Sequence, residues 1–205
     1  MQPFTIVKGV AAPIPAANID TDVIMPKQFL KGVDRSGLRD GVFHELRFDP
    51  SGAVRPDFIL NRAGWRNANF LIVGPNFGCG SSREHAVWGL VQLGIRAVIG
   101  SGFAGIFFDN CARNGLLAVT LDDLAIKRLS DLAADPETNI LTVNLMDQAI
   151  MTSNGTISFD IEPDRKQALI LGLDPIATTL KQRDAIVSFE QAHLARNPWF
   201  QTSDI

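Results

Sequence analysis

The sequence predicts an α/β protein whose sheet is parallel in one part and antiparallel in another. From residue 70 to residue 134, short apolar runs alternate with helical patterns, and after residue 136 strand-like runs follow one another without helices. Parallel strands joined by helices give the first pattern, and hairpins give the second. A third observation is size, because 205 residues with 46% apolar side chains can bury a real core.

The first third of the chain is the least regular. A strand is predicted at residues 4–7 and a proline-broken loop at residues 12–22, and clear periodicity is lost over residues 26–66. Loops of this length inside compact domains are usually functional or mobile. Strands and helices then alternate, and they are predicted at residues 70–73, 83–93, 97–99, 103–114, 116–121 and 122–134.

The last third predicts hairpins and then helices. Strands are expected at residues 140–145, 149–151 and 156–161, with Asn154-Gly155 as the turn between the last two. Helices follow near residues 163–171 and 182–195. No linker divides the chain, so residues 1–205 are predicted to form one domain with a helical C-terminal extension.

Composition excludes several classes of partner. The net charge is −3 and the basic residues are scattered, which argues against nucleic acid. No run of about 18 apolar residues is present, so no membrane span is expected, and no secretory signal is visible. Cys79 and Cys111 are the only cysteines, and a chain of this size does not need one disulfide for stability. We therefore expect a reduced, cytoplasmic protein.

One segment is chemically unusual. Residues 74–85 read Gly-Pro-Asn-Phe-Gly-Cys-Gly-Ser-Ser-Arg-Glu-His and follow an apolar strand. A glycine-rich turn that opens a helix directs backbone N–H groups and the positive end of the helix at one point, which suits an anion. The glycine spacing fits neither the dinucleotide fingerprint nor the Walker loop.

Two interpretations of the serines compete. Ser81 and Glu84 have the spacing of a capping box, in which Ser81 would accept from the Glu84 amide. A serine hydroxyl at a helix N-terminus could equally serve as a base in a site where Arg83 grips a carboxylate with its planar fork. Composition and spacing alone do not decide between them.

The segment Asn76-Phe-Gly-Cys-Gly-Ser-Ser-Arg-Glu-His-Ala86 resembles the signature turn of the small, swivelling domain of the aconitase superfamily. Residues 18–24, 96–107 and 114–117 extend the resemblance, and residues 172–180 and 184–190 are similar to the C-terminal end of bacterial 3-isopropylmalate dehydratase small subunits. The resemblance implies the layered β/β/α swivelling fold. It also implies a hydro-lyase that isomerises 2-isopropylmalate to 3-isopropylmalate by dehydration and rehydration in leucine biosynthesis.

The resemblance assigns roles to the turn. It implies that Ser81 is the base for the carbon-bound proton and that Arg83 grips a substrate carboxylate. Ser82 and Gly80 are expected in the substrate-binding cradle, with helix capping left to Ser82 rather than Ser81. Asp20 and Thr21 are expected near the site without a catalytic role.

The resemblance also implies a partner. The superfamily uses a 4Fe–4S cluster as its Lewis acid, and such a cluster needs three or four thiolates. Two cysteines cannot supply them, so the cluster and any metal site are expected on a large partner subunit rather than on this chain.

The resemblance also implies that substrate choice lies in a loop near residues 26–42, which we expect to be mobile until the partner closes over it. An isopropyl group needs apolar contacts, whereas a more acidic substrate needs a cation, and the loop offers both kinds of side chain. The candidate residues are Phe29, Leu30, Lys31, Val33, Arg35 and Leu38.

Two alternatives therefore stay open at this point. The chain could belong to a related hydro-lyase of the homoaconitase, citraconate or dimethylmalate type. It could also be a non-catalytic regulatory module that holds a carboxylate metabolite in the turn.

Overall fold

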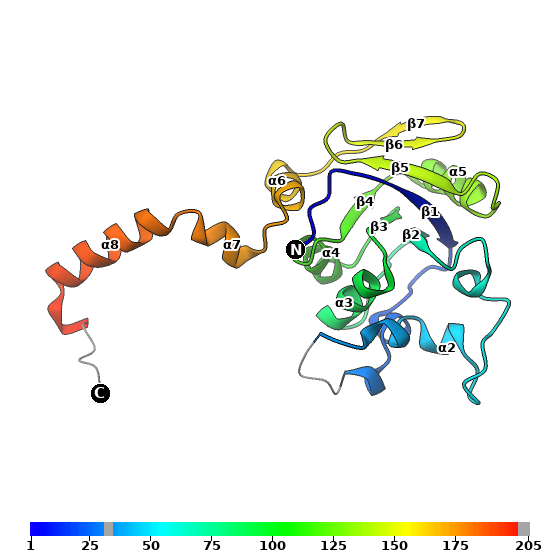
Figure 1. Cartoon of the computed structure of the whole chain (residues 1–205), viewed down its shortest axis with the longest axis horizontal. Coiled ribbons are helices and arrows are strands. Elements are labelled where there is room, and N and C mark those ends of the chain that lie inside the picture. The colour runs from blue at the N-terminus through cyan, green and yellow to red at the C-terminus, as the bar shows by residue number, and fades with distance from the viewer. Residues whose placement is uncertain (31–34, 201–205) are drawn as a thin grey trace.

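A computed structural model describes residues 1–30 and 35–200 of the chain. Its centre is one seven-stranded sheet with the strand order β4-β3-β2-β1-β5-β6-β7 (Figure 1). Strands β1 to β4 are parallel, and the pairs β1–β5, β5–β6 and β6–β7 are antiparallel. The strands span Ile6–Ile14 (β1), Ala68–Val73 (β2), Ala97–Gly100 (β3), Leu117–Thr120 (β4), Ile140–Asn144 (β5), Ala149–Thr152 (β6) and Gly155–Ser158 (β7). The predicted α/β class with a partly parallel sheet and antiparallel hairpins is confirmed.

Helices cover both faces of this sheet. The α-helices span Thr21–Ile24 (α1), His44–Arg47 (α2), Glu84–Leu93 (α3), Gly105–Arg113 (α4), Asp123–Ala133 (α5), Pro163–Leu171 (α6), Pro175–Leu180 (α7) and Arg183–Arg196 (α8). Short 3₁₀ helices span Lys27–Phe29 (η1), Leu38–Gly41 (η2), Ile59–Asn61 (η3) and Pro198–Phe200 (η4). Within residues 1–30 and 35–200, no helix is long and apolar enough to cross a membrane.

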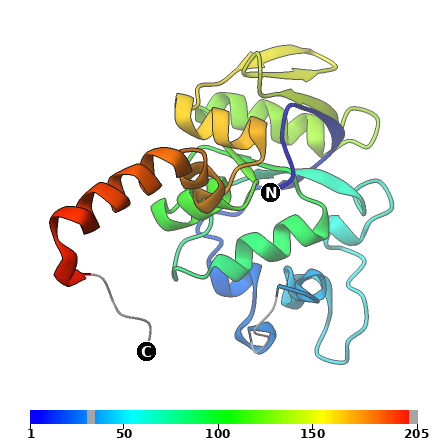
Figure 2. The same cartoon turned by 60° about the vertical axis from the view of Figure 1, so that its left-hand side comes forward.

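Strand β2 has apolar side chains on both faces, so both sides of the sheet must be covered. Its residues Phe70 and Ile72 pack into a core with α5 and the hairpin strands, while Leu71 and Val73 pack into a second core with α3 and α4. Figure 2 shows α3 on one side of the sheet and α6 on the other. A strand that is apolar at every position is typical of a parallel sheet buried on both faces.

Strand β1 is longer than predicted, and the proline-broken loop begins later. The strand runs to Ile14 and includes Pro13, which lies opposite Ile72 of β2. Pairing with β5 ends at Val10, so Pro13 has a sheet neighbour on one side only. A proline is tolerated there because its missing N–H would otherwise point to an unpaired side.

The described part of residues 26–66 is packed rather than an open loop. Val42 and Phe43 are fully buried, and Leu60 and Trp65 are 7% exposed in the core under α3. The Trp65 indole N–H donates to the Ala133 carbonyl at 2.7 Å and so ties this region to α5. The region consists of helices of three or four residues, which are too short to produce a visible period in the sequence.

Helix α6 packs on the body of the protein, whereas α7 and α8 extend away from it. Helix α6 spans the predicted residues, α8 matches the predicted 182–195 helix to within one residue, and α7 was missed. The sequence did carry a signal for α7, because Asp174 caps it by accepting from the Ala177 amide at 2.7 Å and Pro175 follows at the first helical position. We call residues 175–200 the C-terminal arm, and Figure 1 shows it extending away from the sheet.

Candidate active site

The glycine–serine turn connects the end of β2 to α3, and two of its glycines have positive φ. Gly78 has φ +77°, and a Cβ there would lie 2.2 Å from the Phe107 ring. Gly80 has φ +95° and packs against Asp20. A side chain is strained at such φ values, so glycine lets the backbone fold back on itself here.

A stability prediction follows from Gly78. We expect Gly78→Ala to lower the free energy of unfolding by about 3–5 kcal/mol, since backbone strain and overpacking against Phe107 add. Urea denaturation of the full chain measures the change. The matched control is Gly52→Ala, which also has positive φ but no neighbour within 4 Å and should cost about 1 kcal/mol. Equal losses in the two variants would contradict the close packing of the turn.

The loop at residues 18–21 is hydrogen-bonded to this turn along its length. The Gly78 amide donates to the Ile19 carbonyl at 2.7 Å, and the Thr21 amide donates to the Cys79 carbonyl at 2.8 Å. The Ser81 amide donates to Thr21 Oγ1 at 3.1 Å, and the Thr21 side chain is buried. Asp20 accepts from the Val23 amide at 2.8 Å and caps α1. The structure therefore places Asp20 and Thr21 beside the turn as supports.

The serines do not cap α3. The N-cap residue is Arg83, and no side chain makes a capping hydrogen bond there. Both the Ser81–Glu84 capping box and the expected capping by Ser82 are therefore wrong. The reason is that the helix begins only at Glu84, after extended backbone at Arg83, so the serines lie too early in the chain. Ser81 is half-buried and Ser82 is exposed.

Helix α3 is instead fixed by two asparagines, Asn110 in α4 and Asn114, which is the C-cap residue of α4. Asn114 Nδ2 donates to Glu84 Oε1 at 2.6 Å, and the Trp88 indole N–H donates to Asn114 Oδ1 at 2.9 Å. Asn110 is buried and its Nδ2 approaches the Ser82 carbonyl at 3.5 Å. These contacts set the direction in which the turn enters the helix, and hence the position of Ser81.

Arg83 forms an ion pair with Asp22 of α1. The Arg83 side chain is 16% exposed and the Asp22 side chain 48% exposed, so the pair lies at the edge of the turn. The hydrogen bond from Arg83 lowers the pKa of the Asp22 carboxyl below its usual value of 3.8. Asp22 is the residue of this site that sequence reasoning missed. It falls in the predicted loop at residues 12–22, and the sequence contains no signal for a partner 61 residues away.

The lowered pKa makes a titration prediction. A carboxyl whose folded pKa is depressed stabilises the fold above its unfolded pKa of about 3.9, and this contribution is lost as pH falls through the folded value. NMR titration should place the Asp22 pKa below 3.8 in the wild type, and in Arg83→Gln it should rise toward about 3.9. Asp49 is an internal control, because a hydrogen bond from Ser51 lowers its pKa and Arg83→Gln should leave it unchanged. An unchanged Asp22 pKa would mean that the pair does not form in solution.

The structure describes four of the six predicted recognition residues. Phe29 and Leu30 are half-buried at η1, and Leu38 is 4% exposed in the core, so its side chain is not open to a ligand in this conformation. The Arg35 guanidinium lies over the Trp88 ring of α3 at 4.4 Å. Lys31 and Val33 lie outside the described residues.

Gln92 of α3 also holds this loop. Its Oε1 accepts from the Leu38 amide at 2.9 Å, and its Nε2 donates to the Arg35 carbonyl. Trp88 and Gln92 therefore attach both the loop and the turn to one helix. The mobility of residues 26–42 stays a prediction.

The cysteines do not fit a 4Fe–4S cluster. Cys79 and Cys111 are free thiols, and two thiolates are too few. Cys111 is fully buried, and burial raises the pKa of its thiol well above the usual value. Among residues 1–30 and 35–200, no group of three or more His, Cys, Asp or Glu side chains is placed to hold a metal ion.

Comparison with known proteins defines the class. The profile of the aconitase C-terminal domain matches residues 1–124, which include the turn, α1 and α4. A second profile, that of the C-terminal domain of the 3-isopropylmalate dehydratase small subunit, matches residues 176–203, which include most of the arm. The fold and turn are thus those of an aconitase-type swivel domain.

Relatives identify the family within that class. A 3-isopropylmalate dehydratase small subunit 1 of Mannheimia succiniciproducens is 55% identical over 98% of this chain and 100% of its own length. A small subunit 2 of Salmonella typhimurium is 57% identical over 98% of this chain and 97% of its own length. The crystal structure of 3-isopropylmalate dehydratase from Methanocaldococcus jannaschii superimposes with a TM-score of 0.64 at 26% identity, covering 90% of this chain and 99% of that one. The chain belongs to the family of 3-isopropylmalate dehydratase small subunits.

Proposed function

We propose that this chain is the small subunit of a 3-isopropylmalate dehydratase and supplies half of its active site. The reaction moves a hydroxyl between adjacent carbons of a substituted malate, through loss and return of water, in leucine biosynthesis. The identity of 55–57% to members of this family over nearly the whole chain supports this choice of substrate.

One observation carries the catalytic role of Ser81. Its hydroxyl is not used as a helix cap, although it lies directly before the N-terminus of α3. Its amide is fixed by buried Thr21, so the backbone that holds the hydroxyl is rigid. A hydroxyl in this position can take the carbon-bound proton because the positive end of the helix stabilises the resulting oxyanion.

Arg83 provides the carboxylate contact. Its guanidinium is largely screened from solvent and already has Asp22 as a hydrogen-bond acceptor. A guanidinium has five N–H donors, so Asp22 can hold one side of the fork while a substrate carboxylate binds the other. Asp22 therefore has a positioning role toward Arg83. The exposed backbone at Gly80 and Ser82 leaves room for the substrate at this edge.

The metal chemistry belongs to a large partner subunit. We propose that this partner holds the 4Fe–4S cluster, because the two cysteines of this chain cannot. The recognition loop, including Phe29 and Leu30, then contacts the isopropyl group after the two subunits meet.

The C-terminal arm is the element best suited to bind that partner. Its exposed apolar side chains include Ile176 and Trp199, both 72% exposed, and Phe189, 71% exposed. On α8 and η4, His193 stacks with Phe189 at 5.7 Å and Phe200 at 5.6 Å, which presents a preformed aromatic face. Exposed apolar clusters of this kind mark interaction sites.

The two profiles indicate what the arm binds. The domain at residues 1–124 has the sequence of a C-terminal domain of aconitase, whereas the arm has the sequence of a small-subunit segment. A domain that is part of a longer chain in one protein and a separate subunit in another needs a non-covalent attachment in the second. The large subunit is therefore the proposed occupant of the arm.

Co-purification tests the proposal. The tagged chain, expressed with a large subunit of the same family, should bring down an iron–sulfur protein, and the pair should interconvert 2- and 3-isopropylmalate. The chain alone should do neither. Isomerase activity of the chain alone would overturn the half-site proposal, and tight binding of malate homologues by the chain alone that Arg83→Lys abolishes would favour a carboxylate-binding module built on the turn.

A further inference from the structure

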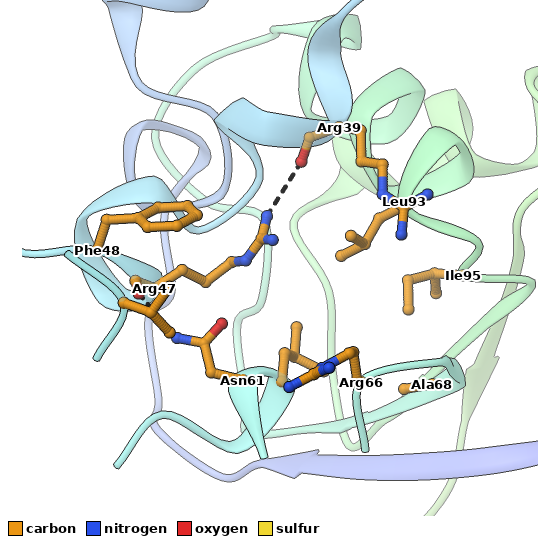
Figure 3. Close-up of a pocket in the computed structure, with 10 residues that line it drawn as sticks. Arg39, Arg47, Phe48, Asn61, Arg66, Ala68, Leu93 and Ile95 are labelled. Atoms are coloured by element: carbon orange, nitrogen blue, oxygen red, sulfur yellow. Dashed lines mark hydrogen bonds between the residues drawn. The ribbon is translucent and has the colours of Figure 1, made fainter. Parts of the chain in front are cut away.

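A second basic site lies at the other end of α3 from the glycine–serine turn. A pocket of about 250 Å³ lies between η2, α2 and η3, where β2 begins and α3 ends. Figure 3 shows the residues that line it. Three arginines line it from three different segments: Arg39, Arg47 and Arg66. Its apolar wall includes Leu93 and Ile95.

Arg47 is the most constrained of the three. Its Nη1 donates to the carbonyl oxygens of Arg39 at 3.1 Å and Val42 at 3.3 Å. Its Nε is buried and has no hydrogen-bond partner. Burial lowers the pKa of Arg47, because the guanidinium has lost water without gaining a carboxylate in contact. Unpaired buried donors are costly, so this group would gain from an anion.

The charges around the pocket are not balanced. Of the residues that line it in the described part of the chain, three are arginines and none is acidic. The negative charge of Asp40 partly offsets the lowering of the Arg47 pKa, but Asp40 does not line the pocket. Arg39 and Arg66 are exposed and can turn toward a ligand at the mouth.

We propose that this pocket binds a small carboxylate that carries an apolar group. The arginines provide the fork geometry that carboxylates prefer, and Leu60, Leu93 and Ile95 provide the surface for a short aliphatic tail. Phosphate fits less well because it has no apolar part to cover that wall. The site is distinct from the catalytic turn, since the ten residues of α3 separate the two ends by about 15 Å.

Calorimetric titration of the full chain with 4-methylvalerate tests the proposal. We expect saturable binding in the millimolar range or tighter, and much weaker binding of 4-methylpentan-1-ol, which lacks the charge. Arg66→Gln should weaken binding by about tenfold without affecting the fold, because Arg66 is exposed. The control is Arg62→Gln, an exposed arginine outside the pocket that donates to the Asp57 carbonyl.

Further variants separate this site from the proposed catalytic one. Ser81→Ala and Arg83→Lys should bind 4-methylvalerate as the wild type does, whatever their effect on isomerase activity. The proposal is overturned if no saturation is seen up to about 10 mM, if Arg62→Gln weakens binding as much as Arg66→Gln, or if Arg83→Lys abolishes it. Loss of binding in the assembled two-subunit complex would also overturn it, and would assign the pocket to an acidic side chain of the partner.

Discussion

Ser81→Ala in the assembled two-subunit enzyme is expected to lower kcat by about 10²–10⁴-fold, the usual contribution of a positioned general base. KM should change little, because Arg83 and the backbone of the turn remain in place to hold the carboxylate. The stability of the chain should stay within about 0.5 kcal/mol of the wild type. That expectation follows from the absence of a capping bond at α3, since loss of a serine N-cap would cost about 1 kcal/mol.

Steady-state kinetics and urea denaturation together check this result. The matched comparison is Ser82→Ala, which removes a hydroxyl from an exposed position in the expected substrate-binding cradle and should raise KM rather than lower kcat. If Ser81→Ala turns over at the wild-type rate, Ser81 is not the base. If it destabilises the chain by about 1 kcal/mol or more, the value for a lost cap, the hydroxyl has a structural role that the geometry does not indicate.

The parts of the fold that were predictable are those with a strong local pattern. The apolar run that ends at Val73, the Asp122 cap of α5 and the glycine that follows α6 each determine local structure through neighbouring residues. The hairpin was predicted at Asn154-Gly155, and the structure places its turn at Ser153 and Asn154, with Gly155 pairing to Thr152 at φ +123°. The element was predictable and its register was off by one residue.

The errors arise where distant residues decide. Pro13 suggested a break in the strand. Strand β1 nevertheless continues to Ile14, because β5 pairs with it only as far as Val10 and Pro13 therefore needs no N–H on that side. The capping box satisfied a local rule, but the amides of Gly78 and Ser81 donate to Ile19 and Thr21, which hold the turn against residues 18–21, and the helix begins only at Glu84. Asp22 could be assigned to Arg83 only once α1 was seen beside the turn. Local sequence therefore predicted the turn itself, and long-range contacts determine how its residues are held; the roles of Ser81 and Arg83 stay predictions.

Removal of the C-terminal arm should weaken association with the large subunit without lowering the stability of the chain. A chain that ends at Leu173 should keep its stability, because α7 and α8, described over their full length, contain no buried residue. Leu173 itself should be kept, since its amide donates to the Ala168 carbonyl at the end of α6. We expect this truncation to weaken association with the large subunit by about 100-fold or more, and isomerase activity to fall with it at low protein concentration.

A double variant tests whether the exposed aromatic side chains of the arm, rather than its backbone alone, bind the large subunit. Phe189→Ser combined with Trp199→Ser removes two large exposed rings, and we expect it to weaken association by at least about 30-fold. Glu190→Ser with Gln191→Ser is the control on the same helix and should bind as the wild type does. Sedimentation of the isolated chain adds a second readout: if the arm instead joins two copies of this chain, the wild type will be a dimer that the truncation dissociates. In that case the large subunit is not what covers the arm, since a face already buried between two copies is not available to it.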